Sequence, residues 1–143
     1  MKILKALMTS LLFVALIGGC AGKGMRGEKA AHLPPGTLNA TDVTKLFAGK
    51  TVESVLDKSG RISLSYYNPN GELRQLQNGE KRTGTWEVRN DGRMCLAFPG
   101  GKRQCRIIVK EGEVYRKYIV KLNGEHIPVL TYKSFREGNL VDK

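Results

Sequence analysis

Two cysteines, Cys95 and Cys105, carry the clearest chemistry in the sequence. They flank Pro99-Gly100-Gly101, which can supply the left-handed glycine of a three-residue hairpin loop. With that loop Phe98 opposes Lys102, and the two cysteines lie directly opposite each other, at a Cα separation of about 4.5 Å that a disulfide accepts. We therefore expect a structural disulfide. Two buried free thiols and a paired metal site are the alternatives, and the metal site lacks partner histidines.

Residue types that serve catalysis are few. The chain has two histidines, His32 in a Gly/Pro-rich stretch and His126 on a face that we expect to point outward. It contains no H-E-x-x-H, no G-x-S-x-G and no phosphate-binding glycine loop. Four carboxylates lie close to turns, but their spacing selects no acid–base pair: Glu72, Glu80, Glu87 and Asp91. The sequence predicts no enzymatic activity, no metal site and no cofactor.

The first 20 residues have the pattern of an export signal. Lys2 and Lys5 precede an apolar run over residues 6–17, which is too short to span a bilayer as a mature helix. The run ends in Ile17-Gly18-Gly19-Cys20, which resembles the lipobox of bacterial lipoproteins, although Gly18 stands where that family more often has Ala, Ser or Thr.

The lipoprotein resemblance implies a processed and anchored protein. Residues 1–19 would be removed, and Cys20 would carry a diacylglycerol and an acyl chain such as palmitate. Ala21 would direct the protein to the outer membrane, with the domain facing the periplasm. Removal of Lys2 and Lys5 lowers the formal net charge from +11 to +9. Residues 20–37, with four glycines and two adjacent prolines, are expected to form a flexible tether.

The remaining residues, 38–143, have the composition of one folded domain. Hydrophobic residues make up 41% of the chain and charged residues 26%, which excludes disorder of the whole. Three cysteines exclude both a disulfide-dense miniprotein and an all-cysteine zinc site. Asn39 is placed to cap a short helix whose apolar side is Val43, Leu46 and Phe47.

From Lys50 onward the sequence alternates with period two and is divided by turn signals at short intervals. This pattern predicts an all-β domain of about eight strands, a small antiparallel barrel or sandwich with lipocalin-like architecture and one short N-terminal helix. With Gly112-Glu113 and Asn123-Gly124 as two-residue turns, Ile107 opposes Tyr118 and Val120 opposes Ile127.

That register places an apolar face toward the core: Cys105, Ile107, Val109, Tyr118, Val120, Ile127 and Val129. The opposite face then carries the cations Arg106, Lys110, Lys117 and Lys121. Two interpretations of this basic face are open. It is either a polyanion-binding stripe or the ordinary solvated outside of a basic barrel.

The order Gly84-x-Trp86, Gly92-x-x-Cys95 and then Cys105 resembles an uncharacterised family of small exported proteobacterial proteins. The resemblance implies a β domain that contains a disulfide. No activity is established for that family. This leaves two functional hypotheses, which differ in what is bound.

The first hypothesis is a non-enzymatic, lipid-anchored binding or accessory module that presents a surface or a cavity, with another envelope protein among its expected partners. The alternative is an envelope-structure protein whose basic face binds an anionic polymer: lipopolysaccharide, peptidoglycan or nucleic acid. A lysozyme inhibitor is disfavoured, because a protein of charge +9 should repel basic lysozymes.

Overall fold

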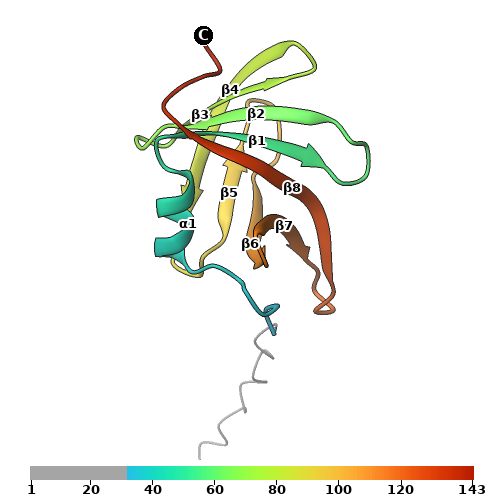
Figure 1. Ribbon diagram of the computed structural model, residues 1–143. Coiled ribbons are helices and arrows are strands. Elements are labelled where there is room, and N and C mark those ends of the chain that lie inside the picture. Colours follow the sequence, from blue (N-terminus) through green and yellow to red (C-terminus); the bar gives the residue numbers. More distant parts are fainter. Residues whose placement is uncertain (1–31) are drawn as a thin grey trace, which may run out of the picture.

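The computed structural model describes residues 32–143, so the expected signal, Cys20 and most of the expected tether lie outside the described residues. The chain forms a closed eight-stranded antiparallel barrel in which β8 returns to pair with β1 (Figure 1). The expected small all-β fold with one short helix is confirmed. The elements are α1 (Ala40–Phe47), β1 (Lys50–Leu56), β2 (Ile62–Tyr67), β3 (Glu72–Gln77), β4 (Glu80–Val88), β5 (Met94–Ala97), β6 (Gln104–Glu111), β7 (Val114–Val120) and β8 (His126–Glu137).

Helix α1 closes one end of the barrel. Its N-cap is Asn39, as expected, and the Asn39 side chain accepts the Asp42 N–H at 2.9 Å. Phe47 inserts its ring between the rings of Tyr67 and Tyr132, with centroids 4.9 and 5.0 Å away. Because Tyr67 is the last residue of β2, the helix lies at the end of the barrel where β2 finishes. In Figure 1, α1 and the β1–β2 and β3–β4 hairpins lie on opposite sides of the barrel.

The segment before α1 adds a short stretch to the sheet. Lys110 donates its backbone N–H to the Gly36 carbonyl at 2.9 Å, and Leu38 donates to the Ile108 carbonyl at 2.9 Å. Strand β5 pairs with β6 only as far as Arg106, so residues 36–38 occupy the edge of β6 that β5 leaves open. The chain therefore joins the barrel beside the later half of β6.

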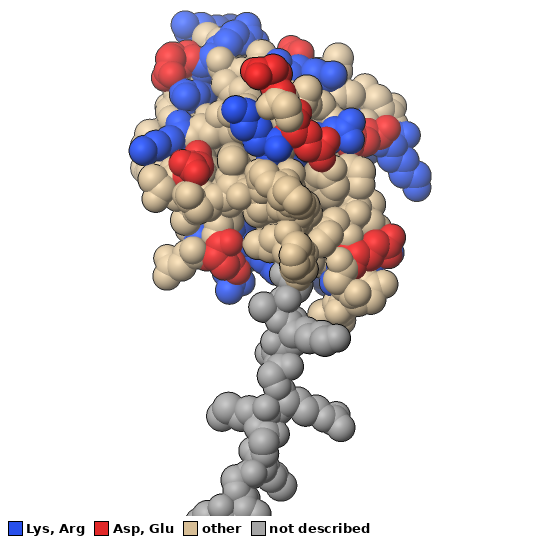
Figure 2. Space-filling model, turned by 60° about the horizontal axis from the view of Figure 1, so that its bottom comes forward, with Lys and Arg blue, Asp and Glu red and all other residues tan. Residues whose placement is uncertain are grey.

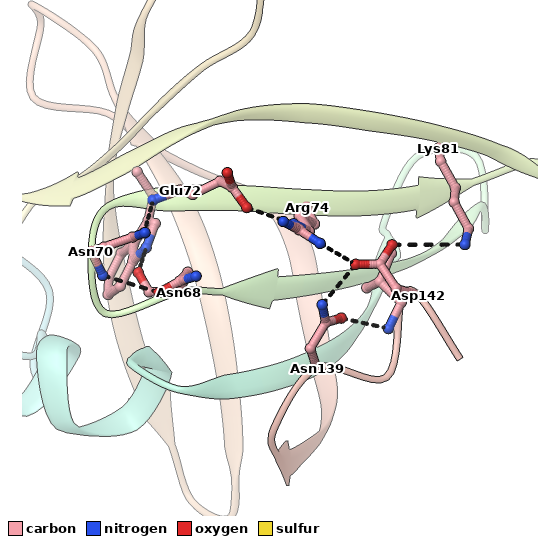
Figure 3. Close-up of polar contacts among 9 residues, drawn as sticks. Asn68, Asn70, Glu72, Arg74, Lys81, Asn139 and Asp142 are labelled. Carbon is pink, nitrogen blue, oxygen red and sulfur yellow. Dashed lines mark hydrogen bonds and ion pairs between the residues drawn. The ribbon is translucent and has the colours of Figure 1, made fainter.

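The residues after β8 fold back over the outside of the barrel. The buried Thr51 hydroxyl donates to the Gly138 carbonyl at 2.6 Å and accepts the Leu140 N–H at 2.9 Å. Further along, Asp142 pairs with Arg74 of β3 at 2.5 Å and with Lys81 of β4 at 3.7 Å (Figure 3). These contacts tie the C-terminal residues to three strands.

Two of the three expected hairpin registers are confirmed. Cys95 pairs with Cys105 and forms the disulfide, and Ile107 pairs with Tyr118. The third register is wrong near its turn, where Val120 pairs with His126 rather than with Ile127. Lys121 pairs with Glu125 across a three-residue loop that ends in the left-handed Gly124, so the turn has one residue more than the expected type I′ turn. A bulge between Lys117 and Tyr118 then restores the expected pairing farther along.

The assignment of the basic residues of β6 and β7 to the outer face is wrong for Arg106 and Lys117, which face the interior. Ile108, two residues after Arg106, lies in the core cluster, and Lys117 pairs with it. The expectation failed because Ile107, Ile108 and Val109 are all buried, each at 1% exposure or less. A strand that is buried on both faces does not reveal by its polarity which face is the interior.

Candidate functional site

The barrel has a cavity of about 700 Å³ at the end opposite α1. Its position follows from the strands: it reaches Leu56 at the end of β1, Ser63 near the start of β2 and Gln104 at the start of β6. The exposed loop Pro99-Gly100-Gly101 forms part of its rim. A volume of this size is typical of small-molecule sites.

The interior wall has a polar part and an apolar part. The polar side chains come from five strands: Ser63, Gln75, Gln77, Arg82, Gln104, Arg106 and Lys117. The apolar side chains are Leu56, Leu96, Phe98, Val129 and Leu130. A ligand in the cavity would therefore meet hydrogen-bond donors, fixed positive charge and a hydrophobic wall together.

Lys117 is the most unusual residue of the wall. Its side chain comes from the middle of β7 and the residue is only 8% exposed. Among the residues that the structure describes, Lys117 has no ion-pair or hydrogen-bond partner, while its ammonium lies 5.8 Å from the centre of the Tyr132 ring. Burial, together with the nearby charge of Arg106, lowers the pKa of Lys117 to about 8.

Arg106 provides a second cation on the neighbouring strand. Its guanidinium donates to the adjacent Cys105 carbonyl at 3.0 Å, and burial lowers its pKa. An arginine keeps its charge throughout the physiological range, so the pair places at least one permanent positive charge in the cavity. No described carboxylate forms an ion pair with Arg106.

Arg82, a third cation, is held in place by its neighbours. Its Nε–H donates to Gln75 Oε1 at 2.8 Å, and Gln75 in turn donates from Nε2 to the Ser65 hydroxyl at 2.9 Å. The guanidinium stacks on the ring of Phe98 at 4.1 Å. Gly84 permits this arrangement, because a Cβ there would lie 2.8 Å from the Phe98 ring. This part of the wall is thus ordered without a ligand.

The cavity lining of the described chain includes no aspartate or glutamate, whereas Arg82, Arg106 and Lys117 are joined at the rim by Arg61 and Lys102. The interior therefore carries net positive charge in a partly desolvated space. Coulomb interactions are stronger there than at an open surface, because water screens them less.

The structure does not bring the four residues of the expected basic face together. Arg106 and Lys117 line the cavity, whereas Lys110 is exposed and lies 5.9 Å from the Tyr115 ring. Lys121 is exposed on the last hairpin, where it pairs with Glu125 at 2.9 Å. On the outer face seen in Figure 2, basic and acidic side chains are interspersed.

The carboxylates considered for acid–base chemistry also lie apart from the cavity. Glu72 pairs with Arg74, Asp91 with Arg93, Glu87 with Arg103, and Glu80 is exposed. Within residues 32–143 no group of three metal-ligating side chains comes together. These four carboxylates therefore lie on the outer surface and not in the cavity.

Arg82 and Gln75 line the cavity but were not predicted from the sequence as site residues. One signal was available for Arg82. Trp86 is a core residue that donates its indole N–H to the Asn68 carbonyl at 2.7 Å, and residues two and four positions earlier on the same strand share its face. Counting back from Trp86 would have placed Gly84 and Arg82 on the inward face of β4, where the exposed Arg82 lines the cavity.

Comparison with protein families, with curated proteins and with solved structures found no match for this chain.

Proposed function

We propose that this protein is a non-enzymatic, lipid-anchored binding module of the bacterial cell envelope whose barrel takes up a small molecule. The single observation that carries the proposal is the cavity of about 700 Å³ at the end of the barrel that α1 leaves open. Sites of this size, with an apolar wall and a few fixed polar groups, are typical of small-molecule binding.

The order of the wall supports a binding role. The chain of hydrogen bonds from Arg82 through Gln75 to Ser65 fixes three side chains on three strands before any ligand arrives. Ser54 and Ser63 are likewise joined through their hydroxyls at 2.9 Å. Preorganised groups lose little conformational entropy on binding, which favours affinity.

The proposal includes a lipid anchor at Cys20 that leaves the cavity accessible. The lipobox-like ending at Cys20 lies outside the described residues, and no helix within residues 32–143 has the length and hydropathy needed to cross a membrane. The described chain enters beside the later half of β6, whereas the cavity reaches the first residue of that strand, Gln104. An anchor at Cys20 would therefore leave the cavity mouth accessible from the periplasm.

Binding of an anionic polymer has less support as the function. That hypothesis needs the cations of β6 and β7 on one outer face, and Arg106 and Lys117 line the cavity instead. A polymer strand cannot follow side chains inside a closed barrel.

Blocking the cavity tests the small-molecule proposal. We expect the chain to bind the neutral fluorescent probe N-phenyl-1-naphthylamine with one site per chain. Val129→Trp places a large ring in the cavity and should remove this binding; Gln104→Trp serves if the first variant does not fold. Binding that persists in both folded block variants would overturn the proposal, as would a parent chain that binds neither this probe nor its anionic analogue 1-anilinonaphthalene-8-sulfonate.

The anchor has its own test. Cys20→Ser should leave the protein without lipid label and move it from the membrane fraction to the soluble fraction, because the resemblance assigns the acyl chains to this cysteine. Unchanged fractionation of the variant would contradict the anchor and would leave the cavity proposal intact.

A further inference from the structure

We propose that the ligand of the barrel is an organic acid, with one anionic group held by Lys117 and Arg106 and an apolar or aromatic body packed against Leu96, Phe98 and Leu130. This inference rests on the proposed binding function and names the chemical class of the ligand. Carboxylate, sulfonate and phosphate groups share the required chemistry.

The ammonium of Lys117 has no counter-charge among the described residues. A buried ammonium is unfavourable unless a negative group or several hydrogen bonds compensate it. Lys117 is 8% exposed and has neither among the described residues, and the nearest cation, Arg106, repels it. An anion from outside the chain would supply the counter-charge that the barrel itself does not provide.

The charges of the wall would select the ligand. The lining combines the interior cations Arg106 and Lys117 and the exposed Arg82 with no described carboxylate, so a cationic ligand would be repelled and a neutral one would leave the charges uncompensated. Arg82 is already bonded to Gln75, whereas Lys117 has no such partner and is free to bind a ligand. An anionic group therefore gains most beside Lys117 and Arg106.

The apolar part of the wall indicates that the ligand also has an apolar part. Leu96, Phe98 and Leu130 line the same cavity from β5, the loop after it and β8. Bare inorganic anions would leave this apolar surface in contact with water, whereas an acid with a hydrocarbon or aromatic body covers it. The combination favours an organic acid over a free phosphate or sulfate ion.

Two probes that differ in one charged group test the inference. 1-Anilinonaphthalene-8-sulfonate carries a sulfonate on the same aromatic body as the neutral N-phenyl-1-naphthylamine. We expect the purified chain to bind the sulfonate at least about tenfold more tightly, as a hydrogen-bonded charge pair in a desolvated site would give. Inorganic sulfate at the same concentration should compete only weakly.

Lys117→Met should reduce the affinity for the sulfonate about tenfold and change the affinity for the neutral probe by less than about threefold. Lys133→Met removes the same charge from an exposed position and serves as the matched control, which should change neither affinity. Because anilinonaphthalene sulfonate also binds basic surfaces, only the part of its binding that Val129→Trp abolishes is counted.

A pH series gives a second readout. Sulfonate affinity of the parent chain should fall as the pH rises from 7 to 10, because Lys117 loses its proton while Arg106, as an arginine, keeps its charge. Burial raises the pKa of the neighbouring Tyr132, so this phenol stays neutral over the range. In Lys117→Met the affinity should be flat over the same range.

The outcomes separate the two proposals. Equal affinity for both probes, unchanged in Lys117→Met, would overturn the organic-acid inference and keep the binding site. Tighter binding of sulfate than of the organic sulfonate would overturn the apolar part of the inference. Absence of any binding that the block variants remove would overturn the small-molecule function itself.

Discussion

The Lys117 ammonium lies 5.8 Å from the centre of the Tyr132 ring, and both residues are less than 10% exposed. The negative face of an aromatic ring attracts a cation, and the attraction is stronger where water is excluded. A neutral ring compensates a charge only in part, so the lowered pKa of Lys117, about 8, is consistent with a net penalty for its charged form. The stability of the ligand-free protein therefore depends on this side chain.

Lys117→Met should stabilise the ligand-free protein at neutral pH. In the unfolded chain Lys117 titrates near 10.5, and in the folded chain near 8. As the pH falls from 10.5 to 8, the unfolded chain binds a proton that the folded chain does not. The parent protein therefore loses stability over this window, by about 3 kcal/mol in total, and the loss is constant below pH 8.

Urea denaturation of both proteins at pH 7 and pH 10 measures the difference. Met has a similar volume without the charge, so the stability advantage of the variant should be largest at pH 7 and should shrink toward pH 10.5. Burial raises the pKa of Tyr67 and Tyr132, but this affects both proteins alike and cancels in the difference. A variant less stable than the parent at pH 7 would show that the ammonium is compensated.

Period-two alternation identified the strands, but it could not show which face of each strand lies inside. On β2 the interior residues are Ser63, Ser65 and Tyr67, while the more apolar Ile62 is 58% exposed. A barrel that lines its cavity with polar side chains reverses the usual relation between polarity and burial. The basic residues of β6 and β7 were misplaced for the same reason.

Local chemistry was predictable where a few neighbouring residues determine it. Asn39 caps α1 through its own side chain, and the loop Pro99-Gly100-Gly101 sets the register of the two cysteines. The cavity was not predictable in this way. It depends on Gln75 and Arg82, which pair across the β3–β4 hairpin, and on Lys117 of β7, which shares a cavity with them only when the barrel closes.

Gly84→Ala should destabilise the protein by about 1–3 kcal/mol, the usual cost of inserting a methyl group into a packed site. The added Cβ would lie 2.3 Å from the Ala97 carbonyl oxygen and 2.8 Å from the Phe98 ring, so backbone or ring must move. Gly101→Ala is the matched control, since its Cβ would have its closest contact at 3.4 Å. Equal urea midpoints for the two variants would mean that β4 and β5 separate at no cost.

The double variant Cys95→Ala/Cys105→Ala should lose about 2–3 kcal/mol, because the closed loop is short and the chain-entropy effect grows with loop length. Chemical denaturation measures the loss. In Cys20→Ser protein, thiol labelling under denaturant without reductant should find no reactive thiol while the bond is intact. Two labelled thiols per chain would contradict the disulfide.

Thr51→Val should release the C-terminal residues from the barrel. Valine keeps the shape of threonine but removes the hydroxyl that accepts the Leu140 N–H and donates to the Gly138 carbonyl. Thr51 is fully buried, so the loss leaves polar groups without partners and should cost about 1–3 kcal/mol. Hydrogen exchange at the Leu140 amide should accelerate in the variant, whereas Thr51→Ser, which retains the hydroxyl, should keep the amide protected. If Val and Ser variants exchange at the same rate as the parent, other contacts, such as the ion pairs of Asp142 with Arg74 and Lys81, hold the C-terminal residues in place.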